Sequence, residues 1–180
     1  METVTKTTTK WVIDPTHSEL TFKVKHLMIS NVKGEFKTFQ ANIDGEDFTK
    51  STISAIIDAS SLSTNNNDRD THLKSPDFFE IEKYPEITFI STSIKKVDDE
   101  FKLVGDLTIK GITKEITLDT EFGGFMKDPY GNEKSGFSIN GKLNRKDFGL
   151  NWNAALEAGG VMVGNEIKIN AEVQFIKQVS

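Results

Sequence analysis

The chain has 180 residues, with 22 Lys and Arg against 27 Asp and Glu, 36% hydrophobic residues and no cysteine. This length suits one domain, and the lack of cysteine excludes a disulfide framework, a cysteine nucleophile and thiolate metal ligands. The net charge of −5 argues against a nucleic-acid partner. No apolar run approaches the roughly 20 residues that a transmembrane helix needs.

The first ten residues are rich in Thr and Lys and contain no apolar stretch. They predict a disordered tail over residues 1–10 rather than a secretory signal. A cytoplasmic location is therefore expected, or a periplasmic one if a leader has been removed. Residues 11–178 are predicted to form one domain, because no linker or internal repeat divides them.

Apolar and polar residues alternate with period two along most of the chain, which predicts strands. In chain order the eight predicted strands are Leu20–His26, Val32–Ile43, Ile53–Ile57, Ile87–Lys96, Phe101–Ile109, Ile116–Phe122, Phe137–Leu143 and Ile167–Phe175. The parity changes between Phe36 and Phe39, which a bulge or a bend would explain. A short extra strand is predicted at Trp11–Asp14.

One substantial stretch, from Asn65 to Tyr84, breaks the alternation. Its residues 66–68 are good helix caps, and Ser75-Pro76 is a second helix-start signal, with proline at the first helical position. Leu73 would be the apolar anchor of this segment. A short helical insertion is therefore predicted around residues 66–82, and a second short helix over 153–158.

The predicted fold class is all-β, because antiparallel strands with polar outer faces form a closed barrel or a sandwich. An eight-stranded barrel is either filled by side chains or holds one small ligand. The chain has 13 Phe but only 2 Trp and 2 Tyr. Since Phe carries no polar atom, this surplus indicates a large dry interior, which could be an ordinary core or an apolar cavity.

Candidate chemistry is sparse. The three histidines do not have the helical spacing of metal ligands, so no metal site is predicted. Asp14, His17 and Ser18 have the residue types of a hydrolytic triad, but they are sequence neighbours and no nucleophile elbow is present. The favoured interpretation is a strand-entry turn capped by Asp14 and Ser18, and no catalytic residue is predicted.

Three polar side chains could lie at the end of an inward-facing row. His26 shares the face of Phe22 and Val24 and must find a hydrogen-bond partner or water. Arg69 lies at the predicted helix start, and Arg145 continues the inward parity of the strand before it. Such an arginine could hold a carboxylate, a phosphate or a protein carbonyl, and a structural pair with an acidic residue such as Asp70 is favoured.

A series of short motifs runs through the chain from Trp11 to Lys177. They are Trp11-x-x-Asp14-Pro15-x-His17-Ser18, Val32-x-Gly34-x-Phe36, Arg69-Asp70-x-His72-Leu73, Asp77-Phe78-Phe79, Tyr84-Pro85-x-Ile87-x-Phe89, Gly105-x-Leu107-Thr108-Ile109-x-Gly111-Ile112-Thr113, Arg145-x-x-Phe148-Gly149-Leu150 and Val163-Gly164-Asn165-x-Ile167. In this order and spacing the chain resembles the YceI-like family, bacterial polyisoprenoid-binding proteins with a lipocalin-like barrel. Asn165 departs from the family pattern, which commonly has an acidic residue there.

The resemblance implies an eight-stranded antiparallel lipocalin-like barrel whose hydrophobic cavity binds and sequesters or transports a polyisoprenoid, an isoprenoid quinone or another long-chain amphiphile. It also implies a homodimer as a common state, and it supplies no catalytic residue and no cofactor besides the lipid. The alternative is an enzyme that hydrolyses or isomerises such a lipid, with His17, His26 or His72 and a nearby Asp as acid–base residues. An incidental cavity in a structural protein is the third hypothesis.

The predicted ligand-binding residues follow from shared parity on successive strands. The cavity wall is predicted to consist of Phe22, Val24, Phe36, Phe89, Leu107, Ile109, Leu118, Phe122, Phe137 and Ile139. His26, Arg69 and Arg145 are predicted to lie near the mouth, where a few polar contacts would set the direction of the ligand.

Overall fold

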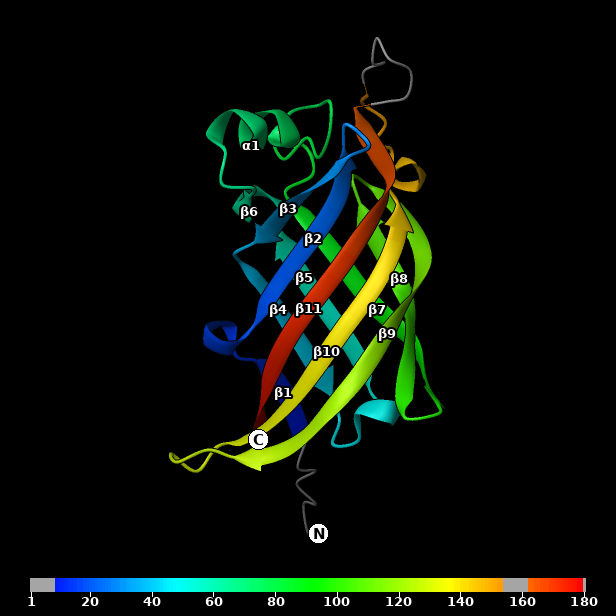
Figure 1. The fold of residues 1–180 in the computed structure, drawn as a ribbon. Helices are drawn as coiled ribbons and strands as arrows, with labels where there is room; N and C mark the ends of the chain where they lie inside the picture. Colours follow the sequence, from blue (N-terminus) through cyan, green and yellow to red (C-terminus); the bar gives the residue numbers. More distant parts are fainter. Residues whose placement is uncertain (1–8, 154–161, 180) are drawn as a thin grey trace, which may run out of the picture.

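The computed structural model describes residues 9–153 and 162–179, which form one antiparallel sheet closed into a barrel (Figure 1). Its strands are β1 (Thr9–Ile13), β2 (Glu19–His26), β3 (Ser30–Phe36), β4 (Phe39–Asp44), β5 (Thr52–Asp58), β6 (Leu62–Ser63), β7 (Glu86–Val97), β8 (Glu100–Ile109), β9 (Ile112–Lys127), β10 (Glu133–Asn144) and β11 (Val163–Val179). One α-helix, α1 (Asn67–Lys74), and the 3-10 turns η1 (Pro15–His17), η2 (Phe48–Lys50), η3 (Ala59–Ser61) and η4 (Arg145–Phe148) connect them.

Eleven strand segments make eight barrel strands because three of the strands are broken. The ring runs β1-β4-β5-β7-β8-β9-β10-β11 and closes through the pairing of β1 with β11. β2 continues the line of β1 along β11, and β3 and β6 likewise continue β4 and β5. The predicted eight-stranded antiparallel barrel is thus confirmed, and the sandwich is excluded by the closed ring.

The parity change predicted between Phe36 and Phe39 coincides with a break between strands. β3 ends at Phe36 and β4 begins at Phe39, and both rings face the barrel interior. The two residues between them break the alternation, so that an odd spacing still places both aromatic side chains inside.

The predicted N-terminal tail is shorter than residues 1–10. The first strand, β1, begins at Thr9, so Thr9 and Lys10 belong to a strand rather than to the predicted tail. Residues 1–8 lie outside the described part.

The helical insertion is shorter than predicted. Asn66 is the N-cap of α1 and accepts a hydrogen bond from the Arg69 backbone N–H at 3.0 Å. The second helix start predicted at Ser75-Pro76 is wrong. Ser75 instead ends α1, and its hydroxyl donates to the His72 carbonyl. Turns rather than helix follow over residues 76–83. The second predicted helix falls on residues 154–158, outside the described residues, apart from Asn153, which is not helical.

The break between β1 and β2 is the capped turn that the sequence predicted. Asp14 is the N-cap of η1 and accepts from the Thr16 N–H at 3.1 Å and from Lys134 Nζ at 3.1 Å, while its other partner is His17 Nδ1 at 2.8 Å. Ser18 accepts from the Gln174 N–H at 3.0 Å. These residues therefore anchor the turn to β11 and β10 rather than form a triad.

Ionised Asp14 is expected to stabilise the fold at neutral pH. Burial alone would raise its pKa, but hydrogen bonds from His17, Lys134 and Thr16 hold the folded-state pKa below the ordinary 3.8. A lowered folded pKa adds stability above the unfolded pKa, and this stability is lost as the pH falls through the folded value. Asp14→Asn should cost about 1–3 kcal/mol at pH 7, and the difference from wild type in urea unfolding should shrink below about pH 4.

The exposed Asp106→Asn is the control, since Asp106 makes no ion pair within the described residues. An Asp14→Asn penalty that stays constant down to pH 3 would contradict the assigned role.

Aromatic side chains close the barrel at the end away from α1. Phe48, on η2 between β4 and β5, is 9% exposed. Its ring centroid lies 5.0 Å from that of Phe101, 4.9 Å from that of Phe122 and 5.1 Å from that of Phe137. These four rings fill the interior there with edge and tilted contacts, which are favourable aromatic geometries. The barrel is therefore filled at one end.

Glycines on inward rows make room for rings on neighbouring strands. A Cβ atom on Gly105 of β8 would lie 2.5 Å from Phe89 Cζ and 2.6 Å from the Ile90 carbonyl oxygen. Because the carbonyl belongs to the backbone and cannot turn away, Gly105→Ala is expected to cost about 1–3 kcal/mol in urea unfolding. At Gly136 the nearest atom to such a Cβ is 4.0 Å away, so Gly136→Ala should stay within about 0.5 kcal/mol of wild type. Equal effects of the two changes would refute this account.

Candidate functional site: an apolar cavity with a polar rim

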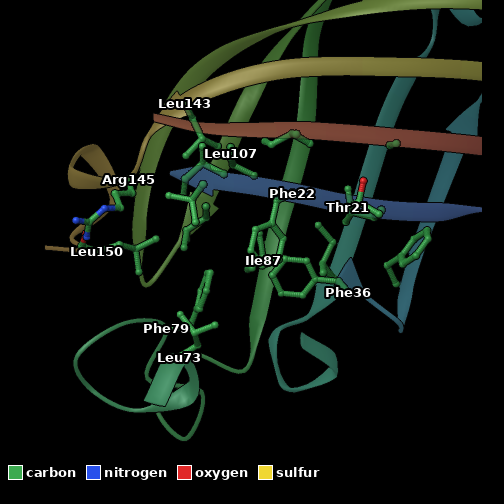
Figure 2. A pocket seen from close by; sticks show the side chains of 18 of the residues that line it. Thr21, Phe22, Phe36, Leu73, Phe79, Ile87, Leu107, Leu143, Arg145 and Leu150 are labelled. Atoms are coloured by element: carbon green, nitrogen blue, oxygen red, sulfur yellow. The ribbon is translucent and has the colours of Figure 1, made fainter. Parts of the chain in front are cut away.

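A cavity of about 580 Å³ occupies the barrel interior between the aromatic closure and α1. Side chains from β2, β3, β7, β8 and β9 form much of its wall, and α1 and the turn after it cover one end. Figure 2 shows Leu73 and Phe79 directed from this cover toward the barrel, opposite Phe22 and Phe36. The interior is thus hollow at the α1 end and filled at the far end.

Most of the predicted wall residues line this cavity. They are Phe22, Val24, Phe36, Phe89, Leu107, Ile109, Leu118 and Ile139. His26, Arg69 and Arg145 also lie on its boundary. The structure therefore brings together inward-facing residues of six strands, β2, β3, β7, β8, β9 and β10, with one residue each from α1 and η4.

Phe122 and Phe137 do not line the cavity, and their predicted place was wrong. They are partners in register on β9 and β10, and their rings lie 5.1 Å apart within the aromatic closure. Their inward parity was correct. Parity tells which face of a strand a residue occupies, but it does not tell how far along the barrel axis the void extends.

The cover of the cavity includes aromatic residues that strand parity could not find. The His72 ring lies 5.2 Å from Phe78 and 4.7 Å from Trp152, and Phe79 meets Phe36 edge-on at 5.9 Å. The apolar cluster at 78, 79 and 81 was the available signal for the turn. Trp152, by contrast, stands in an irregular segment with no periodic pattern.

Arg145 stabilises the backbone at the rim of the cavity. Only 2% of the residue is exposed, and its guanidinium donates to the carbonyls of Gly164 (2.8 Å), Leu150 (2.5 Å), Trp152 (2.8 Å) and Val163 (3.3 Å). Burial lowers the pKa of this guanidinium, yet arginine remains charged in proteins. In Figure 2 the guanidinium lies beside Leu150 and points away from Phe22.

Arg145 thus holds protein carbonyls, and its predicted pairing with Asp70 was wrong. Asp70 instead accepts hydrogen bonds from the backbone N–H of Thr64 at 2.8 Å and from its hydroxyl at 2.5 Å. The prediction failed because the sequence does not show that the chain after η4 folds back over the arginine. Four carbonyls converge there and use its donors.

Arg69 is the more available guanidinium at the rim. Its Nε donates to the Thr64 hydroxyl at 2.8 Å, and its Nη2 donates to the Thr64 carbonyl at 2.9 Å. Among the residues that the structure describes, Nη1 has no hydrogen-bond partner. The side chain is half-buried and borders the cavity.

Two of the three histidines border the same cavity. His72 Nε2 lies 2.8 Å from Asp77 Oδ2, with 39% and 53% of the two side chains exposed. His26 borders the cavity at the end of β2, whereas His17 lies in η1 and is not part of the wall. The described residues contain no group of three or more metal-ligating side chains. The polar rim therefore includes His26, Arg69 and His72, with Lys25, Asn66 and Asp68 beside them, and Asp77 is the partner of His72.

This arrangement can hold an apolar chain in the interior and contact a polar end at the rim. Within residues 9–153 and 162–179, no helix is both long enough and apolar enough to cross a bilayer.

The comparisons with known proteins agree with this architecture. The sequence matches the model of the YceI-like domain over residues 11–175. It is 46% identical over 170 residues to a UPF0312 protein of Staphylococcus epidermidis, covering 93% of this chain and 97% of that one. The crystal structure of a Campylobacter jejuni YceI protein is 40% identical, with a TM-score of 0.70 over 84% of this chain and 88% of that one.

A more distant solved structure shares the fold. It is a polyisoprenoid binding domain from Saccharophagus degradans implicated in plant cell wall breakdown, 14% identical, with a TM-score of 0.66 over 92% of this chain and 97% of that one.

Proposed function

The chain belongs to the YceI-like family, and from this premise we propose that it binds a long-chain amphiphilic lipid, such as a polyisoprenoid or an isoprenoid quinone, and sequesters or carries it. The observation that carries the proposal is the 580 Å³ apolar cavity. The polyisoprenoid-binding domain that shares the fold is consistent with this ligand class.

The cavity limits how much of a lipid it can enclose. At about 30 Å³ for each group of water or methylene size, 580 Å³ holds on the order of twenty carbon atoms. That is about four isoprene units, and each buried methylene contributes roughly 0.8 kcal/mol. An apolar chain of this length therefore has ample affinity, even after the cost of ordering it.

The head group is proposed to lie at the rim. Arg69, His26 and His72 all border the cavity, and Nε2 of His72 is already paired with Asp77. Arg145 is assigned no contact with the ligand, because its hydrogen bonds go to backbone carbonyls. A carboxylate, phosphate or carbonyl head group suits these donors.

Mass spectrometry of an organic extract of the purified protein tests the proposal. The expected result is a long-chain lipid in near-stoichiometric amount, or its uptake when the lipid-free protein is mixed with detergent-solubilised isoprenoids. A protein that contains no lipid and takes none up would overturn the carrier function and favour an incidental cavity.

Affinity is expected to depend on chain length up to the capacity of the cavity. Competition against a fluorescent lipid should show tighter binding from two to three to four isoprene units, and little further gain at nine units. The reason is that units beyond about the fourth extend past the cavity and gain no burial. A steady gain through nine units would contradict the enclosed volume.

A lipid-modifying hydrolase or isomerase is the second candidate, and the His72–Asp77 pair beside the cavity is the observation that favours it. Such a pair could move a proton to or from a bound lipid. Incubating the protein with a lipid ester or an isoprenoid and analysing the extract distinguishes the two functions. A product that depends on His72 would favour catalysis, and recovery of unchanged lipid would favour binding.

A further inference from the structure

The turn between β2 and β3 presents three large apolar side chains to solvent. Leu27, Met28 and Ile29 are 37%, 60% and 83% exposed. Leu27 and Met28 adopt φ values of 53° and 62°, a left-handed conformation that usually holds Gly, Asn or Asp in turns. The turn is nevertheless well held, since the Leu27 N–H donates to the Met162 carbonyl at 2.8 Å. Leucine and methionine therefore occupy backbone positions where Gly, Asn or Asp would adopt the left-handed conformation at a lower cost in free energy.

This apolar turn stands at the mouth of the cavity. His26 just before it and Val32 shortly after it border the cavity, as does Met162, which binds its backbone. In Figure 1 the turn lies near the top, between α1 and the start of β11. Leu27, Met28 and Ile29 therefore lie next to residues of the cavity wall at this end of the barrel.

A row of lysines crosses the outer face of the barrel below this turn. Lys33 on β3 is in register with Lys23 on β2, Lys23 with Lys168 on β11, and Lys168 with Lys142 on β10. All four are exposed, and Lys25 adds a fifth positive charge nearer the turn. Like charges directly opposite each other destabilise a sheet. Of the five, within the described ranges, only Lys142 has an ion-pair partner, Glu166 at 4.0 Å.

At the mouth end of this face the five lysines outnumber the acidic Glu166, which pairs with Lys142. Farther from the mouth, Glu19 and Glu172 are register partners on β2 and β11. The whole chain carries a net charge of −5. An acidic protein that concentrates unpaired lysines around one apolar tip is oriented by its own field toward a negatively charged surface.

We propose that the Leu27–Met28–Ile29 turn and the lysine row form a docking surface for an anionic lipid bilayer. The apolar side chains enter the boundary between head groups and acyl chains, and the lysines contact anionic head groups, which supplies the two signals that stable interfacial binding needs. The mouth then faces the membrane, and a lipid passes without crossing water. This last step rests on the proposed function, whereas the docking itself does not.

Co-sedimentation with vesicles tests the docking. Vesicles of phosphatidylcholine with one third phosphatidylglycerol should bind the wild-type protein, more weakly at high salt, and pure phosphatidylcholine vesicles should not bind it. Met28→Ser with Ile29→Ser should reduce the partition to anionic vesicles at least about tenfold. No binding by the wild type, or binding that the double change leaves intact, overturns the proposal.

The far end of the barrel offers a matched control. Met126 lies near the end of β9, and Tyr130 lies in the turn between β9 and β10. The two residues are 74% and 89% exposed. Met126→Ser with Tyr130→Ser removes similar apolar surface away from the mouth and should leave vesicle binding unchanged. An equal loss in this variant would show that the apolar contact is unspecific and would contradict the assigned orientation.

The lysine row has its own test. Replacing Lys23, Lys33 and Lys168 by Gln should abolish the preference for anionic vesicles while Tm stays the same or rises, because opposed charges are removed. The same change at Lys95, Lys96 and Lys127, toward the closed end, should preserve the preference. An unchanged preference in the first variant, or an equal loss in the second, contradicts the role of the row.

Uptake of detergent-solubilised isoprenoid separates this proposal from the carrier function. Turn variants that take up lipid normally but do not bind vesicles support both. A wild-type protein that binds anionic vesicles through the turn yet takes up no lipid refutes the carrier function alone, and one that takes up lipid but ignores vesicles refutes the docking alone.

Discussion

Ala55→Trp is expected to reduce lipid uptake by at least about tenfold while the barrel still folds. Ala55 lies on β5, borders the cavity and is in register with Phe89 on β7. An indole ring there occupies volume that the ligand would fill. Displacing two or three methylene groups removes about 1.6–2.4 kcal/mol of burial at roughly 0.8 kcal/mol each, which exceeds a factor of ten in affinity. Competition binding and the lipid content of the organic extract measure the effect.

The neighbouring outward residue provides the matched control for this change. Ile56 is 45% exposed on the outer face of the same strand, so Ile56→Trp adds the same ring outside the barrel and should leave uptake unchanged. Because the new ring at position 55 enters a void rather than a packed core, its stability cost should stay near the lower end of the usual 1–3 kcal/mol for overpacking. An Ala55→Trp protein with wild-type affinity would show that the lipid does not occupy this cavity.

Arg145→Met is expected to destabilise the protein by about 3–5 kcal/mol, as removing one partner from a buried charged network does. The guanidinium donates to four backbone carbonyls, of Leu150, Trp152, Val163 and Gly164. Methionine fills a similar length but donates no hydrogen bond, and each buried carbonyl left without a donor costs about 1–3 kcal/mol. Urea unfolding at pH 7 measures the loss.

Lys146→Met is the control for Arg145→Met, because Lys146 is the exposed next residue of the same 3-10 turn. It should change stability by no more than about 0.5 kcal/mol. If Arg145→Met instead kept its stability and lost only lipid binding, Arg145 would be a head-group contact, and its assignment as a support of the rim would be wrong.

The sequence predicted the site better on the strands than off them. Residues such as Phe22, Phe89 and Leu107 were placed on the wall because a strand alternates its faces strictly, whatever its neighbours are. Arg145 was harder, since its place in the rim depends on carbonyls of the segment after η4, whose path has no periodic pattern. Trp152 lies in an irregular segment and Phe48 in the short 3-10 turn η2, and for both the sequence contained no periodic signal of position.

The sequence by itself determined the all-β class, the inward faces and the capped turns, because these depend on residues adjacent or two apart along the chain. Only the tertiary structure decided where the cavity ends. That limit is set by Phe48 folding back between β4 and β5 to meet Phe101, Phe122 and Phe137. Contacts between residues so distant in sequence arise from ring closure and strand register, and alternation along a single strand contains no information about either.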